Sequence, residues 1–197
     1  MENTEEKKEN RKDVKYTVNL RAIHDCMLAT SKEEVRYYLG GISIKDVDGR
    51  RHYAGTDGHI LVHFDEEING EPLNEEIILK PLVKFKVDKN DEEALLYGSL
   101  QIIDDRTALL RGVDEETKVA CNIIDGTYPS YERVLPEKDT PKLEKYISFN
   151  ADYLKVVKKV LTTNPPVQQA LDNTSPCLWE TFKALCNVQC VLMPMRV

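Results

Sequence analysis

The spacing of apolar and polar residues predicts one strand, one helix and three further strands between residues 16 and 68. The first residues of this segment alternate like a half-buried strand, and the apolar residues from Leu20 to Met27 then fall at helical spacing. The remaining apolar runs are rich in β-branched and aromatic residues, and the dipeptide Asp48-Gly49 is typical of a tight turn between strands. The segment therefore predicts a β-α-β-β-β unit.

The same order of elements begins again near residue 75. A short helix is expected within residues 80–90, although Pro81 and its β-branched neighbours weaken that pattern. Polar turns at residues 104–105 and 114–116 separate the later apolar runs. The strands of this second unit are expected at residues 75–79, 94–104, 107–113 and 117–124.

A third unit occupies the end of the chain. Residues 143–150 predict a strand and residues 151–161 a helix, with Asn150 as its N-cap. Residues 163–187 fit strand or helix equally well, and the last apolar run reads as a strand that ends at Pro194. The fold class predicted is therefore α+β, with three β-α-β-β-β units of about 55–65 residues each.

Composition and charge narrow the class of protein. Of the 197 residues, 41% are hydrophobic and 31% charged, as in ordinary globular proteins. The formal net charge of −7 argues mildly against bulk attraction to nucleic acid but leaves room for one basic face. No apolar run suits a membrane span and no signal peptide is visible, so a cytoplasmic location is expected. Residues 1–14 are almost all polar or charged and are expected to be a disordered tail, with an interaction arm as the alternative.

Metal, cofactor and disulfide chemistry find little support in the sequence. Five widely spaced cysteines without a secretion signal favour buried, reduced thiols over a disulfide framework. His59 and His63 would share one face of a strand at a separation of about 13 Å, too far apart for one ion. We therefore expect no metal site and no cofactor, and ordinary strand histidines, His52 included. The cysteines are Cys26, Cys121, Cys177, Cys186 and Cys190.

The sequence also gives little support for an enzyme. Thr56, Asp57 and His59 stand close together and suggest acid–base chemistry, but Asp57-Gly58 is equally what a tight turn between strands requires. No paired nucleophile and base stand out elsewhere in the chain. The sequence therefore predicts a protein that is not an enzyme.

Several sequence blocks, taken together and in order, resemble the bacterial DNA polymerase III beta subunit, the DNA sliding clamp. Those resembling the family's central domain are EEVRYYLGGISI, YAGTDGHILV and DGTYPSYERVLP, and those resembling the second half of its third domain are YISFNADYLKVVKKVL and CVLMPMRV. The resemblance covers residues 15 to 197, most poorly at 163–187. It implies the clamp fold, with a two-unit domain at residues 15–136 and a half-domain at residues 137–197.

Clamp half-domains cover each other's apolar faces in pairs, so the third half-domain implied here would leave one apolar face uncovered by its own chain. A homo-oligomer that covers this face is therefore expected. The family's ring contains twelve half-domains, and four chains of this kind would supply the same number. A tetrameric ring is therefore one hypothesis, and a dimer or a form that is not a ring is the other.

The resemblance also implies a pocket that binds short peptides of partner proteins. From the residues alone, the apolar end of the chain is either a final core strand or, because of its flexible methionines, part of a groove for peptides. Ile60 stands where the family usually has a basic residue, which predicts a less polar rim. The residues implied to bind the peptide are Leu39, Thr56, Gly58, His59, Leu61, Pro129, Arg133, Val134, Val191, Leu192, Met193, Pro194, Met195 and Arg196.

Contact with double-stranded DNA is a further implication of the resemblance. The family's ring-lining helices carry basic residues, and the counterparts here are Arg21, Lys155, Lys158 and Lys159. The alternative is that these side chains form only a solvated helix face. The first function expected is thus a clamp that tethers a polymerase and is handled by a clamp loader. The second is a peptide-binding decoy that sequesters clamp partners without encircling DNA. A purely structural subunit is the third.

Overall fold

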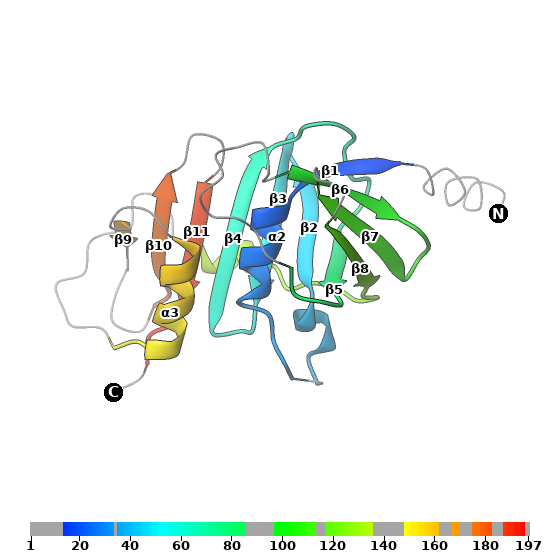
Figure 1. Cartoon of the computed structure of the whole chain (residues 1–197). Helices are drawn as coiled ribbons and strands as arrows, with labels where there is room; N and C mark the ends of the chain where they lie inside the picture. Colours follow the sequence, from blue (N-terminus) through cyan, green and yellow to red (C-terminus); the bar gives the residue numbers. More distant parts are fainter. Residues whose placement is uncertain are drawn as a thin grey trace.

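The computed structural model describes residues 14–33, 35–85, 97–112, 117–135, 148–161, 167–169, 175–182 and 187–195. Within these residues, eleven antiparallel strands form one sheet in the order β1-β6-β7-β8-β5-β2-β3-β4-β11-β10-β9, with helices α2 and α3 against one side (Figure 1). The strands are β1 (Lys15–Asn19), β2 (Ile42–Val47), β3 (Arg50–Thr56), β4 (Ile60–Glu67), β5 (Ile77–Pro81), β6 (Tyr97–Ile102), β7 (Thr107–Gly112), β8 (Lys118–Ile123), β9 (Val167–Gln169), β10 (Cys177–Phe182) and β11 (Asn187–Leu192). The helices are α2 (Leu20–Met27) and α3 (Ala151–Val160), with 3-10 turns η1 (Tyr37–Gly40) and η2 (Tyr131–Val134).

The first unit has the predicted order, from β1 through α2 to β2, β3 and β4. Asn19 caps α2, because its side-chain oxygen accepts a hydrogen bond from the Ala22 amide at 3.0 Å. The turn between β2 and β3 is also confirmed: Asp48 and Gly49 both have positive φ, 49° and 77°, as a two-residue hairpin turn of this type requires. Just before β2, residues 37–40 form the 3-10 turn η1.

In the second unit, β5 to β8 lie where the sequence predicted strands. The helix expected within residues 80–90 is wrong for its described part, because residues 80–81 end β5 and residues 82–85 are bends or irregular. The remainder of that segment lies outside the described residues.

The third unit contains the predicted helix. Asn150 is its N-cap and accepts a hydrogen bond from the Asp152 amide at 2.8 Å. The strand expected at residues 143–150 lies mostly outside the described residues, and residues 148–150 are irregular. Where the sequence left strand and helix open, the structure has the strands β9 and β10.

Long-range strand pairing joins the three units. β1 pairs with β6 and β2 with β5, which connects the first unit to the second. β4 pairs with β11 over six residues, from Asn187 opposite Asp65 to Leu192 opposite Ile60. The sheet is therefore continuous between the first and third units. The domain boundary expected at residues 136–137 lies outside the described residues.

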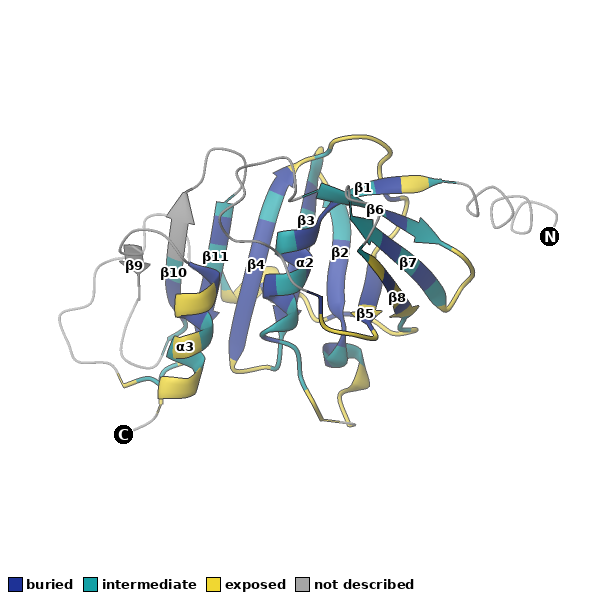
Figure 2. Ribbon diagram, in the orientation of Figure 1, coloured by how far each residue is buried: buried dark blue, intermediate teal, exposed yellow. Residues whose placement is uncertain are grey.

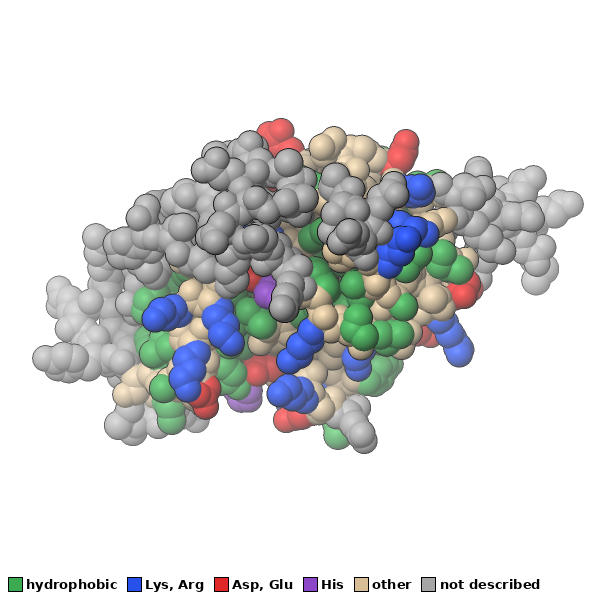
Figure 3. Space-filling model, viewed as in Figure 1, with side chains coloured by type: hydrophobic (Ala, Val, Ile, Leu, Met, Phe, Trp, Pro, Cys, Tyr) green, Lys and Arg blue, Asp and Glu red, His purple; other side chains and the backbone are tan. Residues whose placement is uncertain are grey.

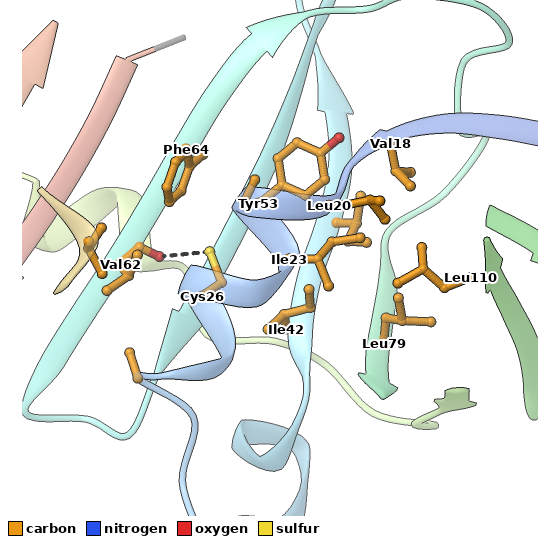
Figure 4. Close-up of a cluster of buried hydrophobic side chains, with 14 of the residues drawn as sticks. Val18, Leu20, Ile23, Cys26, Ile42, Tyr53, Val62, Phe64, Leu79 and Leu110 are labelled. Atoms are coloured by element: carbon orange, nitrogen blue, oxygen red, sulfur yellow. Dashed lines mark hydrogen bonds between the residues drawn. The ribbon is translucent and has the colours of Figure 1, made fainter. Parts of the chain in front are cut away.

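The main core lies between the sheet and the two helices. Alternate residues of β4 and β11, such as Val62 and Cys190, face this side, and Val157 and Val160 of α3 close it. The strands beneath the helices are largely buried, whereas the outer side of α3 is exposed (Figure 2). In the centre of the core the Cys26 thiol donates to the Val62 carbonyl at 3.5 Å (Figure 4).

The four described cysteines are buried free thiols, as expected, and burial raises the pKa of Cys26, Cys121 and Cys190. Cys186 lies outside the described residues. None of the described helices has the length and apolar character needed to cross a membrane.

Candidate functional site

A second, smaller apolar cluster lies on the face of the sheet that is turned away from the helices. The period of two along each strand creates it: Ile60 and Val62 face the main core, and Leu61 between them faces the other side. Leu61 lies opposite Val191 on β11, which in turn lies opposite Leu178 on β10. The buried members of this cluster are Leu39, Ala54, Leu61, Ile78, Tyr128, Tyr131, Leu178 and Val191.

This cluster forms the floor of a cavity of about 290 Å³. Four parts of the chain meet around it: residues 36–39 at η1, the turn between β3 and β4, residues 129–134 with η2, and the end of β11. Apolar side chains remain partly open to solvent at its edge, with Val134 39% and Met193 40% exposed. The lining residues are Arg36, Tyr38, Leu39, Thr56, Gly58, His59, Ile60, Leu61, Pro129, Ser130, Tyr131, Val134, Val191 and Met193.

The turn at residues 56–60 is held by its own side chains. The Thr56 hydroxyl donates to the Ile60 carbonyl at 2.6 Å and accepts from the Gly58 amide at 3.0 Å. One carboxylate oxygen of Asp57 accepts from the amides of His59 and Ile60, at 2.8 and 3.0 Å. Gly58 has a φ of +93°, which side-chain-bearing residues rarely adopt. The tight-turn reading of this segment is thus confirmed.

Neighbouring segments hold the same turn from outside. The Thr56 amide donates to the Tyr128 hydroxyl at 3.1 Å, and the Tyr153 hydroxyl of α3 donates to Asp57 at 3.0 Å. The Met193 amide, just after β11, donates to the His59 carbonyl at 3.1 Å. The cavity wall is therefore assembled from segments that lie up to 157 positions apart in the chain (Arg36 to Met193).

The chain is similar in sequence to known proteins. No family model matches the chain. It is 27% identical over 122 residues to the beta sliding clamp of Pseudomonas aeruginosa, which covers 59% of this chain and 31% of the relative. It is 30% identical over 129 residues to that of Haemophilus influenzae, covering 63% and 33%. The chain thus spans about a third of the length of the curated relatives it matches.

The solved structures agree on the fold. The DNA polymerase sliding clamp from Pseudomonas aeruginosa superposes with a TM-score of 0.68 at 19% identity, covering 93% of this chain and 66% of that one. The DNA polymerase III beta subunit from Thermotoga maritima gives 0.66 at 16% identity, with coverage of 93% and 66%. The chain is a partial homologue of the bacterial beta sliding clamp.

The fold of this clamp homologue is the clamp fold that the sequence predicted. The beta sliding clamp family is not enzymatic, which agrees with the expectation of a protein without catalytic activity.

Nine of the residues expected to bind a peptide in the clamp homologue line the cavity, and four others do not. Leu192 faces the main core, because Val191 beside it faces the cavity and adjacent strand residues point to opposite sides. Arg133 is exposed on η2, and Pro194 and Met195 lie beyond the lining residues. Arg196 lies outside the described residues. The nine are Leu39, Thr56, Gly58, His59, Leu61, Pro129, Val134, Val191 and Met193.

Five lining residues were not among those expected. Tyr38 and Arg36 adjoin Leu39 in the same sequence block, and Ser130 and Tyr131 adjoin Pro129, so adjacency to expected residues was the available signal. Ile60 is the fifth. It is only 3% exposed and belongs to the main core, so it does not form a rim open to solvent.

A stacked pair of histidines, the buried His63 and the partly buried His52, adjoins the cavity. The rings of His52 and His63 stack with centroids 5.3 Å apart, and their facing nitrogens are 3.1 Å apart. His63 also pairs with Gln189 of β11 at 3.1 Å and lies beside the Tyr131 ring at 5.4 Å. Burial lowers the pKa of His63 to about 4 and also lowers the pKa of His52. Both therefore serve as neutral packing groups at neutral pH.

No metal site is formed by the described residues, which contain no group of three His, Cys, Asp or Glu side chains suited to an ion. His59 is exposed at the turn, whereas His63 is 4% exposed within the sheet.

The basic residues considered for DNA contact lie on the helix side of the clamp homologue. Figure 3 shows Lys and Arg side chains gathered over α3, where Lys155, Lys158 and Lys159 are exposed. Lys155 pairs with Asp152 at 2.8 Å. Arg21 on α2 is only 12% exposed and pairs with the buried Asp25 at 3.4 Å. Arg21 and Lys155 are thus both engaged with carboxylates.

Proposed function

We propose that this chain is a clamp-like protein of DNA replication that binds short peptides of partner proteins in the cavity. The observation that carries the proposal is the junction of four segments around an apolar floor, in a chain homologous to sliding clamps. Val134 and Met193 leave apolar surface open at the edge, which is the kind of surface that a bound side chain would cover. The proposed partners are a DNA polymerase and a clamp loader, in the cytoplasm.

The chemistry of the lining residues indicates the kind of peptide. Leu61 and Val191 offer an apolar floor, so a Leu or Phe anchor gains about 25 cal/mol per Å² of apolar surface buried, before ordering costs. Arg36 and His59 at the exposed edge supply polar contacts to peptide carbonyls or an acidic residue.

The test is the affinity of a fluorescein-labelled decapeptide with Leu and Phe anchors, measured by fluorescence anisotropy. Val134→Ala should weaken binding about threefold to tenfold, because it removes apolar contact at the cavity edge. Val47→Ala is the matched control: Val47 is 43% exposed, much as Val134 is at 39%, but it does not line the cavity. Equal effects of the two substitutions, or no saturable binding by the wild type, would exclude this site.

Whether the chain also encircles DNA separates two forms of this function. A homo-oligomeric ring would act as a processivity factor, and the side chains facing DNA would be Arg21, Lys155, Lys158 and Lys159. The two domains proposed for the chain are residues 15–136 and residues 137–197. A form that is not a ring would act as a decoy that sequesters clamp partners. The ion pairs of Arg21 and Lys155 favour the second form, because they reduce the positive charge that is available to phosphates.

A further inference from the structure

The turn that lines the cavity depends on both oxygens of one carboxylate. Oδ1 of Asp57 accepts from the His59 and Ile60 amides at 2.8 and 3.0 Å, which fixes the backbone of the turn from within. Oδ2 accepts from the hydroxyl of Tyr153 at 3.0 Å. A single side chain from α3 is therefore bonded to the group that shapes this wall of the cavity.

Tyr153 also contacts an exposed residue of that wall, His59. Its ring lies 6.2 Å from the ring of His59, with 24° between the planes. Burial, followed by the charge of Asp57, raises the pKa of the Tyr153 hydroxyl, which therefore remains a donor at neutral pH. One face of Tyr153 thus supports His59 while its hydroxyl holds Asp57.

The helix that carries Tyr153 is itself fixed beside the cavity. Val157 and Val160 are buried in the main core with the residues of β11. The Met195 amide, beyond the end of β11, donates to the carbonyl of Ser148 just before the helix at 2.8 Å. Met193, two residues before Met195, lines the cavity. The chain segment after β11 therefore contacts both the start of α3 and the cavity wall.

We infer that Tyr153 is a positioning residue of the peptide site: through Asp57 it holds the turn at residues 56–60 in the shape that a bound peptide requires. The inference rests on the proposed peptide binding. This role of Tyr153 differs from a direct contact with the peptide, because a hydroxyl that acts through Asp57 has no effect on peptide affinity once the Asp57 carboxylate is removed.

A double-mutant cycle tests this distinction, with Kd for the same labelled Leu/Phe peptide as the readout. Tyr153→Phe keeps the ring and removes only the hydroxyl, and it should raise Kd about threefold to tenfold. Asp57→Ala should raise Kd more, since it also releases the two turn amides. In the Asp57→Ala background, Tyr153→Phe should raise Kd no further.

Tyr97→Phe is the matched control. Its hydroxyl donates to the Glu66 carboxylate at 3.1 Å, a similar bond outside the cavity lining, so its loss should leave Kd unchanged. If Tyr153→Phe raises Kd by the same factor in both backgrounds, or has no effect in either, the positioning role is excluded.

Amide hydrogen exchange supplies a readout that does not depend on the peptide. In Tyr153→Phe the amides of His59 and Ile60 should exchange faster, while those of β7 keep the wild-type rate. Should the wild type fail to bind the peptide, the proposed function fails. Unchanged exchange at both amides would then overturn the role of Tyr153 in shaping the turn as well, whereas faster exchange would support that role.

Discussion

At the scale of single residues, the buried His63 is expected to make stability depend on pH. Its pKa in the folded protein is about 4, mainly because of burial, against roughly 6.5 in an unfolded chain. The unfolded chain therefore takes up a proton between these two values while the folded protein does not. The free energy of unfolding should fall by up to about 3 kcal/mol as the pH drops through this window, and this contribution is constant below about pH 4.

Urea unfolding from pH 7 down to about pH 4.5 measures this effect. His63→Gln provides the comparison, because glutamine keeps hydrogen-bonding groups near Gln189 and His52 but does not titrate. The variant should be less stable at pH 7 and should lose less stability on acidification. His52 remains and contributes in the same direction, since its pKa is also lowered. A pH dependence identical to that of the wild type would show that other groups control acid unfolding.

At the scale of elements, the two helices begin at asparagine caps with unequal surroundings. Asn150 accepts from one amide at an exposed position, so Asn150→Ala should cost about 1 kcal/mol. Asn19 caps α2 and also donates to the buried carboxylate of Glu66 at 2.9 Å. Asn19→Ala should therefore cost about 2–3 kcal/mol, because the carboxylate loses a partner in the core. Chemical unfolding of both variants checks the order; equal losses would show that the bond to Glu66 adds nothing.

The elements also show what the sequence could predict and what it could not. Local signals sufficed for β1, α2 and the turn at Asp48, and for α3 with its cap, because periodicity and capping act over a few residues. The pairing of β4 with β11 is long-range, and no local signal encodes it. The resemblance named Val191 and Leu192 together, whereas alternation along the final strand, which is a local rule, sends them to opposite faces.

At the scale of the whole molecule, the open edges of the sheet bear on assembly. Among the described residues, β1 and β9 stand at the two ends of the strand order, so each is hydrogen-bonded to a strand on one side only. Such edges present unpaired backbone groups that can accept a strand from another copy. In the proposed homo-oligomer, copies would associate by edge-to-edge pairing that continues the sheet.

The mass in solution at micromolar concentration, measured by light scattering after size exclusion, decides between the two proposed forms. A ring of four chains, each of 22.6 kDa, would have a mass of about 90 kDa that persists on dilution. That result would direct the next experiment to retention on circular DNA and release after its linearisation, which only topological enclosure explains. A mass of 22.6 kDa would exclude the ring, because the single sheet formed by the described residues does not close on itself and cannot surround a duplex. The cavity would remain, since residues of one chain line it completely in the described structure, and peptide capture would then be the activity to measure.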